Sequence, residues 1–528
     1  MVGFIITFFK LTLKFIIKSI RFFGLYWFCV PFGIGIVYEL ITGEISFKQP
    51  IINFLQNTTF YMCFPLIVLT SIQNILRIIK RDNQYNIYKS IFSIFTTKNK
   101  VGFTADPNLV SKNQISGFVF GKQNNRYVTK GEQEDGHILV IGGPGSGKSS
   151  CIAIPSVMSW KERIFAIDIK GELYEKTKKA RNENNIKIFN PCDRNANGYN
   201  PFYTLENTKN ITQAVNQISM SIIPLNPQVK DPFWITQAQA YLTGAILFYY
   251  KFGLSFSETM IEIKSKPCKQ LVALIMESDN TEAKMQMAVF ADMDEKTLAG
   301  IFAEVSRHIA IFATDEDLIN ALDGNGNCIT PKDLEEGKDI FICISEELID
   351  QWKSLLGMMC NQFLKAFEKR ADGNDKPILF LLDEFPRLGK IEAITNGLAT
   401  LRSKKIQIAL FIQSKSQLNV TYGKETAEVI ADTCTYKAIL KASEPNTQEW
   451  CSKLVGTYDK RKISSGYNTD VLGVGKGAST NTTTEEKRII KPEEFAYLQD
   501  IVCIFPTGYL RVDKAPYYQD GAFNKGVV

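Results

Sequence analysis

Residues 137–150, HILVIGGPGSGKSS, place a glycine-rich turn before a lysine and two serines, a spacing that suits phosphate binding. Glycines let backbone N–H groups converge on phosphate oxygens, and Lys148 can reach the outer phosphates. The Ser149 hydroxyl can bind Mg²⁺, and the helix that opens here adds the positive end of its dipole. We therefore predict a nucleoside triphosphate site. Its loop consists of Gly142, Gly143, Pro144, Gly145, Ser146, Gly147, Lys148, Ser149 and Ser150.

A pair of acids follows the apolar run in PILFLLDEFPRLG, residues 377–389. Buried parallel strands have this composition, and ligands bind at the carboxyl ends of such strands. Asp383 is the candidate to hold Mg²⁺, and Glu384 is the candidate to orient or deprotonate an attacking water. Two acids after a strand also suit a solvated turn, so that alternative stays open.

The next apolar run, IQIALFIQ at 406–413, ends in Gln413. In NTPases with a glutamate directly after the metal-binding aspartate, this strand commonly lies between the phosphate-loop strand and the acidic strand. We therefore expect Gln413 to face the γ-phosphate; an ordinary strand-end amide is the alternative. Further strands are expected at 163–170, 339–345 and 435–441. These runs predict an α/β fold, a RecA-like P-loop NTPase domain.

The segment between the two nucleotide motifs is predicted to be helical. Residues 204–310 lack long β-branched runs and repeat apolar residues at helical spacing. We expect an inserted all-α domain, or alternatively extra helices on the same core. The nucleotide-binding domain then comprises 82–203 and 311–528. Within its second part, residues 464–484 are rich in Gly, Ser, Asn and Thr and are expected to form a flexible loop.

The first hundred residues indicate attachment to a membrane. Uncharged runs of 17 and 28 residues occupy 22–38 and 49–76. We expect two transmembrane helices within 22–81, with a soluble core hairpin as the alternative. Basic residues flank the pair of runs on both outer sides, so both ends are expected in the cytoplasm. Residues 1–21 carry cations on one helical face and are expected to lie on the membrane surface, or to form a disordered tail.

Charge and cysteine content exclude some classes of protein. The 528 residues carry a net charge of +6, and the first hundred carry +8, which leaves about −2 for the rest. Bulk charge therefore gives no argument that the main body binds nucleic acid. The eleven cysteines form no C-x-x-C pair, and there are only two histidines. A disulfide framework or a structural zinc site is not expected.

Together the motifs resemble the coupling proteins of conjugative type IV secretion systems, of the TraG and TrwB kind. The further matching segments are IDIKGEL at 167–173, FNPCDRNANGYNPF at 189–202, FWITQAQAYLTGAI at 233–246, LRSKKIQIALFIQSKSQL at 401–418 and KPEEFAYL at 491–498. The sequence departs from the family at Ser403, Lys404 and Lys405, where a small or glycine-rich turn is common. Cys434 stands where the family often has asparagine.

The resemblance implies a hexameric ATPase anchored in the bacterial inner membrane, with its ATPase body in the cytoplasm and ATP and Mg²⁺ as cofactors. Implied partners are other inner-membrane components of the secretion system, the lipid bilayer, and cargo that is a relaxase on single-stranded DNA, an effector protein, or both. It also implies a nucleotide between subunits, to which Arg402 or Arg387 of a neighbour contributes; a surface ion pair is the alternative. An FtsK-like DNA translocase and a scaffold that binds nucleotide without hydrolysis are the rival interpretations.

Overall fold

The computed structural model describes residues 105–206, 208–225, 231–323, 326–373, 376–469 and 475–523. All of them belong to the second of two compact units, residues 101–528. The segment predicted to lie on the membrane surface, 1–21, and the two predicted spans within 22–81 lie outside the described residues. Among the helices that are described, none combines the length and the apolar character needed to cross a membrane.

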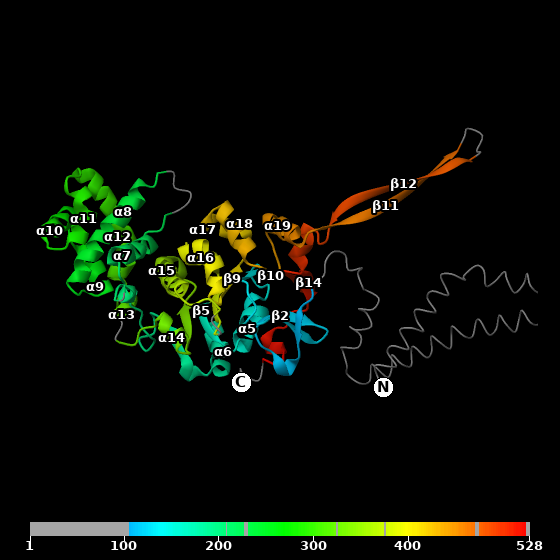
Figure 1. The fold of residues 1–528 in the computed structure, drawn as a ribbon, viewed down its shortest axis with the longest axis horizontal. Coiled ribbons are helices and arrows are strands. Elements are labelled where there is room, and N and C mark those ends of the chain that lie inside the picture. Colours follow the sequence, from blue (N-terminus) through cyan, green and yellow to red (C-terminus); the bar gives the residue numbers. More distant parts are fainter. Residues whose placement is uncertain are drawn as a thin grey trace, which may run out of the picture. The chain divides into compact units, whose positions relative to one another are not determined.

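A mixed sheet of nine strands runs through this unit (Figure 1). Its order is β14 (Gly508–Val512), β13 (Ile501–Phe505), β10 (Tyr436–Ile439), β4 (Ile138–Ile141), β9 (Ile406–Ile412), β8 (Ile378–Leu382), β5 (Arg163–Ile169), β7 (Asp339–Ile344) and β6 (Ile186–Phe189). Neighbours from β10 to β6 are parallel, whereas β13 is antiparallel to both β10 and β14. The expected parallel α/β sheet is confirmed from β10 to β6, and the antiparallel pair extends it at one edge.

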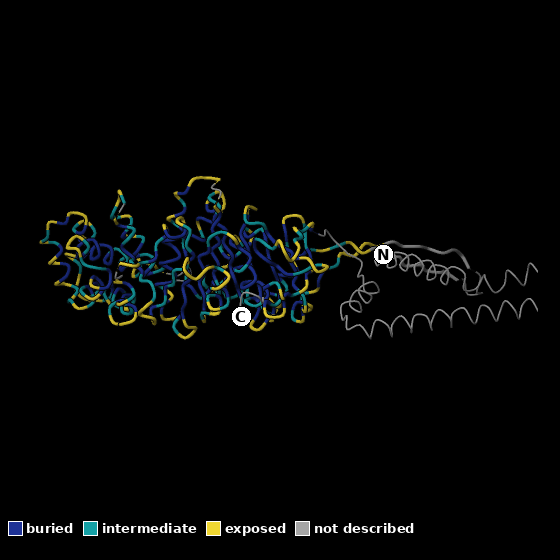
Figure 2. The backbone as a smooth tube through the Cα atoms, turned by 90° about the horizontal axis from the view of Figure 1, so that it is seen from below, coloured by how far each residue is buried: buried dark blue, intermediate teal, exposed yellow. Residues whose placement is uncertain are grey.

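Helices cover both faces of the sheet, which explains why its strands are apolar throughout. On β4, Ile138 and Val140 belong to one buried cluster, and Leu139 and Ile141 belong to another. The first cluster includes residues of α5 (Ile154–Ser159), and the second includes residues of α15 (Ile349–Glu368) and α16 (Glu392–Ser403). Because a strand directs alternate side chains to opposite faces, each strand contributes to both clusters. Figure 2 shows this buried core in dark blue.

A group of helices occupies the chain between β6 and β7, drawn in green in Figure 1. These are α7 (Ile211–Ile222), α8 (Phe233–Lys251), α9 (Phe256–Ser265), α10 (Cys268–Glu277), α11 (Thr281–Ala291), α12 (Glu295–Thr314), α13 (Glu316–Leu322) and α14 (Pro331–Glu335). Helix α8 packs against α7, α11 and α12. Local signals set the helix starts, since Asn280 and Asp294 accept backbone hydrogen bonds as N-caps of α11 and α12.

Smaller elements complete the unit. A three-stranded antiparallel sheet contains β1 (Asn108–Val110), β3 (Arg126–Lys130) and β2 (Phe118–Gln123) in that order. The remaining α-helices are α6 (Glu172–Arg181), α17 (Lys415–Tyr422), α18 (Lys424–Thr433) and α19 (Pro445–Val455). The short η2 (Lys148–Ala153) is π-helical, and the 3₁₀ helices include η5 (Phe385–Leu388).

Residues 464–484 do not form the flexible loop that their composition predicted. Strands β11 (Thr457–Thr469) and β12 (Gly475–Arg488) pair antiparallel as a two-stranded ribbon, drawn in orange in Figure 1. For the described residues of this segment the prediction was wrong. Threonine favours extended backbone, and pairing supplies partners for the N–H and C=O groups of a segment that is poor in apolar residues. The amino-acid composition alone does not predict the pairing of β11 with β12.

Candidate functional site

The glycine-rich loop joins β4 to η2 and is held by the neighbouring strands. The N–H of Gly142 donates to the carbonyl of Ile412 at 3.0 Å, at the end of β9. The N–H of Gly143 donates to the carbonyl of Lys441 at 2.7 Å, just after β10. The loop therefore starts at the carboxyl edge of the parallel strands, where this class of sheet binds ligands.

The loop glycines stand where side chains would clash or strain the backbone. Gly145 and Gly147 have φ of 67° and 98°, in the left-handed region that glycine adopts most easily. A Cβ on Gly142 would lie 2.5 Å from the Ser146 hydroxyl. That hydroxyl is buried and has no hydrogen-bond partner among the described residues. An unsatisfied donor in a loop of this geometry fits an anionic ligand such as phosphate.

Lys148 faces an acidic side chain at the same edge of the sheet. Its Nζ donates to the carbonyl of Gly142 at 2.6 Å and lies 3.8 Å from Oε1 of Glu384. Burial lowers the pKa of Lys148, and the charges of Glu384 and Asp383 oppose that shift. Among the described residues these are the partners of the ammonium, which is thereby suited to bind a phosphate oxygen as a further one.

Asp383 and Glu384 follow β8 directly and have different surroundings. Burial, followed by the charge of Glu384, raises the pKa of Asp383 to about 7, while Lys148 opposes the rise. Glu384 has φ of 48°, which is uncommon outside glycine, so the chain turns sharply where the strand ends. Its Oε2 accepts a hydrogen bond from Nε2 of Gln413 at 2.8 Å. Lys148, Glu384 and Gln413, predicted from three separate segments, are therefore in one site.

The order of strands explains how these residues meet. β9 lies between β4 and β8, as predicted from the glutamate that directly follows Asp383. Gln413 follows β9, so its amide reaches Glu384 at the end of the neighbouring strand β8. Ser149 and Ser150 lie half-buried in η2, and Pro144 is exposed on the loop. The hydroxyl of Ser149 and the carboxylate of Asp383 are the hard oxygen ligands that Mg²⁺ prefers.

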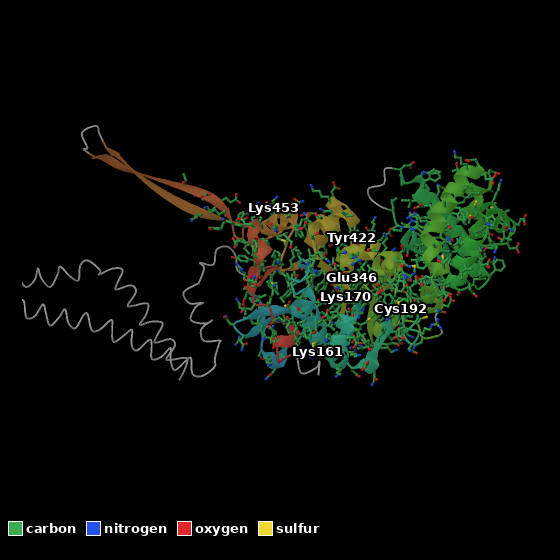
Figure 3. The ribbon with its side chains drawn as sticks, turned by 180° about the vertical axis from the view of Figure 1, so that it is seen from behind. Lys161, Lys170, Cys192, Glu346, Tyr422 and Lys453 are labelled. Carbon is green, nitrogen blue, oxygen red and sulfur yellow. The ribbon has the colours of Figure 1, made fainter. Side chains whose placement is uncertain are left out.

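Within the described residues, neither candidate arginine forms a hydrogen bond or an ion pair with Lys148, Asp383 or Glu384. Arg402 is exposed near the end of α16, just before the amino end of β9, and it makes no ion pair with the described residues. Arg387 in η5 pairs with Asp350 at 3.0 Å and with Glu346 at 3.5 Å. Glu346 also pairs with Lys170 at 2.9 Å, and both are labelled in Figure 3.

Asp168 was not among the predicted site residues, although it lies in the IDIKGEL segment. It is the last residue but one of β5, next to β8, and its side chain is 1% exposed. Burial raises the pKa of Asp168 to about 6, against the backbone N–H groups of Tyr174 and Leu173. An acid near the end of a buried apolar strand was the signal that could have found it.

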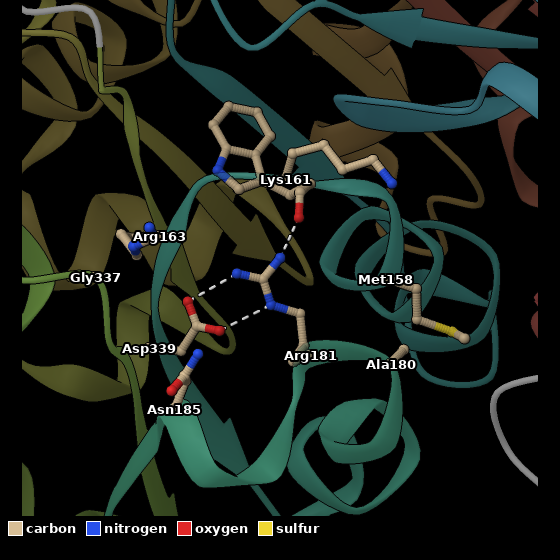
Figure 4. A pocket seen from close by; sticks show the side chains of 9 residues that line it. Met158, Lys161, Arg163, Ala180, Arg181, Asn185, Gly337 and Asp339 are labelled. Atoms are coloured by element: carbon tan, nitrogen blue, oxygen red, sulfur yellow. Dashed lines mark hydrogen bonds and ion pairs between the residues drawn. The ribbon is translucent and has the colours of Figure 1, made fainter.

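A separate cavity of about 160 Å³ lies at the amino ends of β5 and β7 (Figure 4). Its central feature is Arg181, which binds both carboxylate oxygens of Asp339, at 2.7 and 2.8 Å, and the carbonyl of Glu162 at 2.6 Å. The carbonyl of Trp160 accepts from its remaining guanidinium nitrogen. Four of the five guanidinium N–H groups of Arg181 are therefore used within the fold, and its ion pair with Asp339 stabilises this edge of the sheet.

Residues 92–527 match the family model described as Type IV secretory system Conjugative DNA transfer. The chain belongs to this family. The resemblance drawn from the motifs is thereby confirmed.

Curated relatives from this family have low sequence identity to this chain, but the matches extend over most of its length. Protein VirD4 of Rhizobium radiobacter is 26% identical over 428 residues, which are 77% of this chain and 61% of that protein. Protein VirD4 of Rhizobium rhizogenes is 25% identical over 87% of this chain and 70% of its own length. The conjugal transfer protein TraG of Rhizobium radiobacter is 23% identical, over 72% and 62%. For two of these three relatives, the match thus covers less than two thirds of the relative's own length.

Solved structures show the same fold. The bacterial conjugative coupling protein TrwBdeltaN70, in complex with sulphate, has a TM-score of 0.62 at 17% identity, over 78% of this chain and 94% of that one. The plasmid coupling protein TrwB in complex with the ATP analogue ADPNP has a TM-score of 0.61 at 17% identity, over 79% and 94%. The α/β NTPase fold with a mixed sheet and helices is therefore common to these proteins and this chain.

Proposed function

We propose that this chain is a RecA-like, ATP-driven coupling protein that passes substrates into a type IV secretion channel. The observation that carries the proposal is the contact between Lys148, Glu384 and Gln413 at the carboxyl ends of the strands. These residues are far apart in the chain, and a lysine, a carboxylate and an amide at one phosphate loop are what nucleotide hydrolysis requires. The family membership supports the coupling role.

The residues divide into those that bind the nucleotide and those that act on water. The N–H groups of the loop and the ammonium of Lys148 would hold the phosphates, while Ser149 and Asp383 would hold Mg²⁺. The metal supplies neutralisation of the charge on the phosphate oxygens. Glu384 would accept a proton from the attacking water, and Gln413, already bound to Glu384, would fix that carboxylate and detect the γ-phosphate. TrwB has been solved with ADPNP and with ADP and Mg²⁺, which supports these cofactors.

A hexameric ring is the assembly that we propose, with each nucleotide between two subunits. Arg402 is the better candidate for the arginine supplied by a neighbour, because it is exposed and makes no ion pair with the described residues. Arg387 already pairs with Asp350 and Glu346 in its own chain. Removing an arginine that a neighbour supplies costs ~10³ to 10⁵ in turnover, whereas an exposed ion pair contributes little.

Attachment and cargo complete the proposal. Residues 22–81 would form two helices in the bacterial inner membrane, with 1–21 on its cytoplasmic surface and the ATPase in the cytoplasm. The nucleotide-binding domain would comprise 82–203 and 311–528, and the helices within 204–310 would form an all-α domain that receives cargo. The proposed partners are other inner-membrane secretion components and cargo that is a relaxase–DNA complex or an effector protein.

Transfer from cells that carry Lys148→Ala tests the proposal. Transfer is expected to be lost while the protein still inserts in the inner membrane, because the change removes the ammonium that would hold the phosphates and lies outside the predicted spans. Lys453→Ala is the matched control, since this lysine is 61% exposed and pairs with Glu449 on its own helix; it should transfer like wild type. Wild-type transfer by the Lys148→Ala chain would contradict the proposal.

A further inference from the structure

We propose that Asp168 is a positioning residue of the nucleotide site, whose Oδ1 accepts a hydrogen bond from a water molecule of the hydrated Mg²⁺–nucleotide. The inference deepens the proposed ATPase function and rests on it. Asp168 belongs to β5 and was not among the residues that the sequence placed in the site.

The alternation of side chains along the strands places Asp168 on the face of the phosphate loop. Ala166 of β5 and Leu381 of β8 belong to the same buried cluster as Ile152, which lies in the helical turn after the loop. Because a strand turns every second side chain to the same face, Asp168 and Asp383 continue the positions of Ala166 and Leu381. Both carboxylates therefore leave the sheet toward the loop side.

The register brings the two carboxylates together. β5 and β8 are parallel, with Ile167 opposite Leu382, so the residues that follow, Asp168 and Asp383, stand side by side. They are close enough to interact electrostatically. On the neighbouring strands, the same face ends in Gln413 after β9. Asp168 is thus the next member of the row that already contains the proposed metal-binding acid and the proposed γ-phosphate sensor.

The two oxygens of Asp168 have different partners. Oδ2 accepts a hydrogen bond from the N–H of Tyr174 at 2.8 Å, in the first turn of α6. Oδ1 is buried and has no hydrogen-bond partner among the described residues. A buried carboxylate oxygen without a donor is costly, so the geometry indicates a donor from outside the protein, and the water around a divalent cation is such a donor.

Asp168→Asn in the full chain separates the hydrogen bond to the Tyr174 N–H from the proposed hydrogen bond to the water molecule. Asparagine keeps one oxygen that can accept from the Tyr174 N–H, but its other arm is an amide nitrogen that cannot accept. The probe is a fluorescent, non-hydrolysable ATP analogue whose affinity is measured as Mg²⁺ is titrated. We expect the Mg²⁺ concentration at half-maximal effect to rise about 10- to 100-fold, the usual consequence of losing a partner of a metal-bound group. ATP turnover should fall as well.

Asp294→Asn is the matched control. Asp294 caps α12 by accepting from the N–H of Thr297, in the group of helices between β6 and β7, so its Mg²⁺ titration should match wild type. Melting temperatures report whether each chain is folded. If Asp168→Asn does not fold, Asp168→Ser retains an acceptor for Tyr174 and replaces it in the same titration.

The outcomes distinguish this inference from the function on which it rests. A wild-type Mg²⁺ titration in the folded Asp168 variant, together with loss of analogue binding in Lys148→Ala, would overturn the inference and leave the proposed function intact. If the wild-type chain binds the analogue no better with Mg²⁺ than without it, the cation site itself is absent and both fall. A rise confined to the Asp168 variant supports the inference.

Discussion

Glu384→Gln is expected to separate nucleotide binding from hydrolysis. Glutamine has nearly the same shape, and its amide can still pair with Gln413, whose Nε2 lies 2.8 Å from Oε2 of Glu384. What is lost is the group that accepts a proton from water. Loss of a general base costs about 10² to 10⁴ in rate, which corresponds to about 3 to 5 kcal/mol in the barrier.

The same change should leave ATP affinity unchanged or improve it. Nζ of Lys148 lies 3.8 Å from Oε1 of Glu384, and the two side chains are only 8% and 16% exposed. A carboxylate at that distance competes with a phosphate for the ammonium, and a neutral amide competes less. The Glu384→Gln chain is therefore expected to bind ATP at least as tightly as wild type.

Both effects can be measured on the purified full chain. Phosphate release gives the rate of turnover, and binding of a fluorescent ATP analogue gives the affinity. Glu346→Gln is the matched control: Glu346 is 55% exposed and pairs with Lys170 and Arg387. Because exposed ion pairs contribute little, its turnover should change by less than about fivefold. Wild-type turnover in Glu384→Gln, or equal losses of binding and turnover, would refute the assignment of Glu384 as the base.

Three further expectations concern the framework around the site. Burial lowers the pKa of His137 to about 4, whereas an unfolded histidine titrates near 6.5. As the pH falls from 6.5 to 4, the unfolded chain therefore binds a proton that the folded chain does not bind. The free energy of unfolding should decrease by about 3 kcal/mol over this range. His137→Gln should make the melting temperature less dependent on pH over that range. An unchanged pH dependence would contradict the lowered pKa of His137. Arg181→Ala leaves Asp339 buried without its ion-pair partner and should lower the free energy of unfolding, measured with denaturant, by about 3 to 5 kcal/mol. An unchanged free energy of unfolding would contradict this. Gly142→Ala would bring a Cβ within 2.5 Å of the Ser146 hydroxyl and 3.1 Å of Lys148 Cγ, and it should weaken ATP-analogue binding; binding at the wild-type level would contradict this prediction.

The strands were predictable because they are apolar and buried on both faces. The runs at 406–413 and 163–170 correspond to β9 and β5 within one residue at either end. The position of β9 between β4 and β8 was predicted from the glutamate directly after Asp383, because NTPases with this pair commonly have that strand order. The antiparallel β13 and β14 were not expected, since a short apolar run gives no direction for the strand.

Apart from the grouping of Lys148, Glu384 and Gln413, contacts between distant segments could not be predicted from the sequence. Asp168 at the end of an apolar strand looks the same whether it only caps a helix or also faces a ligand, and the register with β8 is needed to decide. Arg387 was a candidate for a neighbour's site, but its partner Asp350 is 37 residues away in sequence and sits beside it only in the fold. The ribbon of β11 and β12 was missed because its composition is that of a loop.

ATP hydrolysis by the purified full chain, with and without single-stranded DNA, tests the central claim most directly when it is compared with Lys148→Ala. The account predicts that wild type releases phosphate and that the Lys148→Ala chain does not. Equal rates in the two chains would contradict it, because hydrolysis would then not depend on the phosphate loop. No hydrolysis by wild type in either condition would also contradict it and would favour a scaffold that binds nucleotide without using its energy.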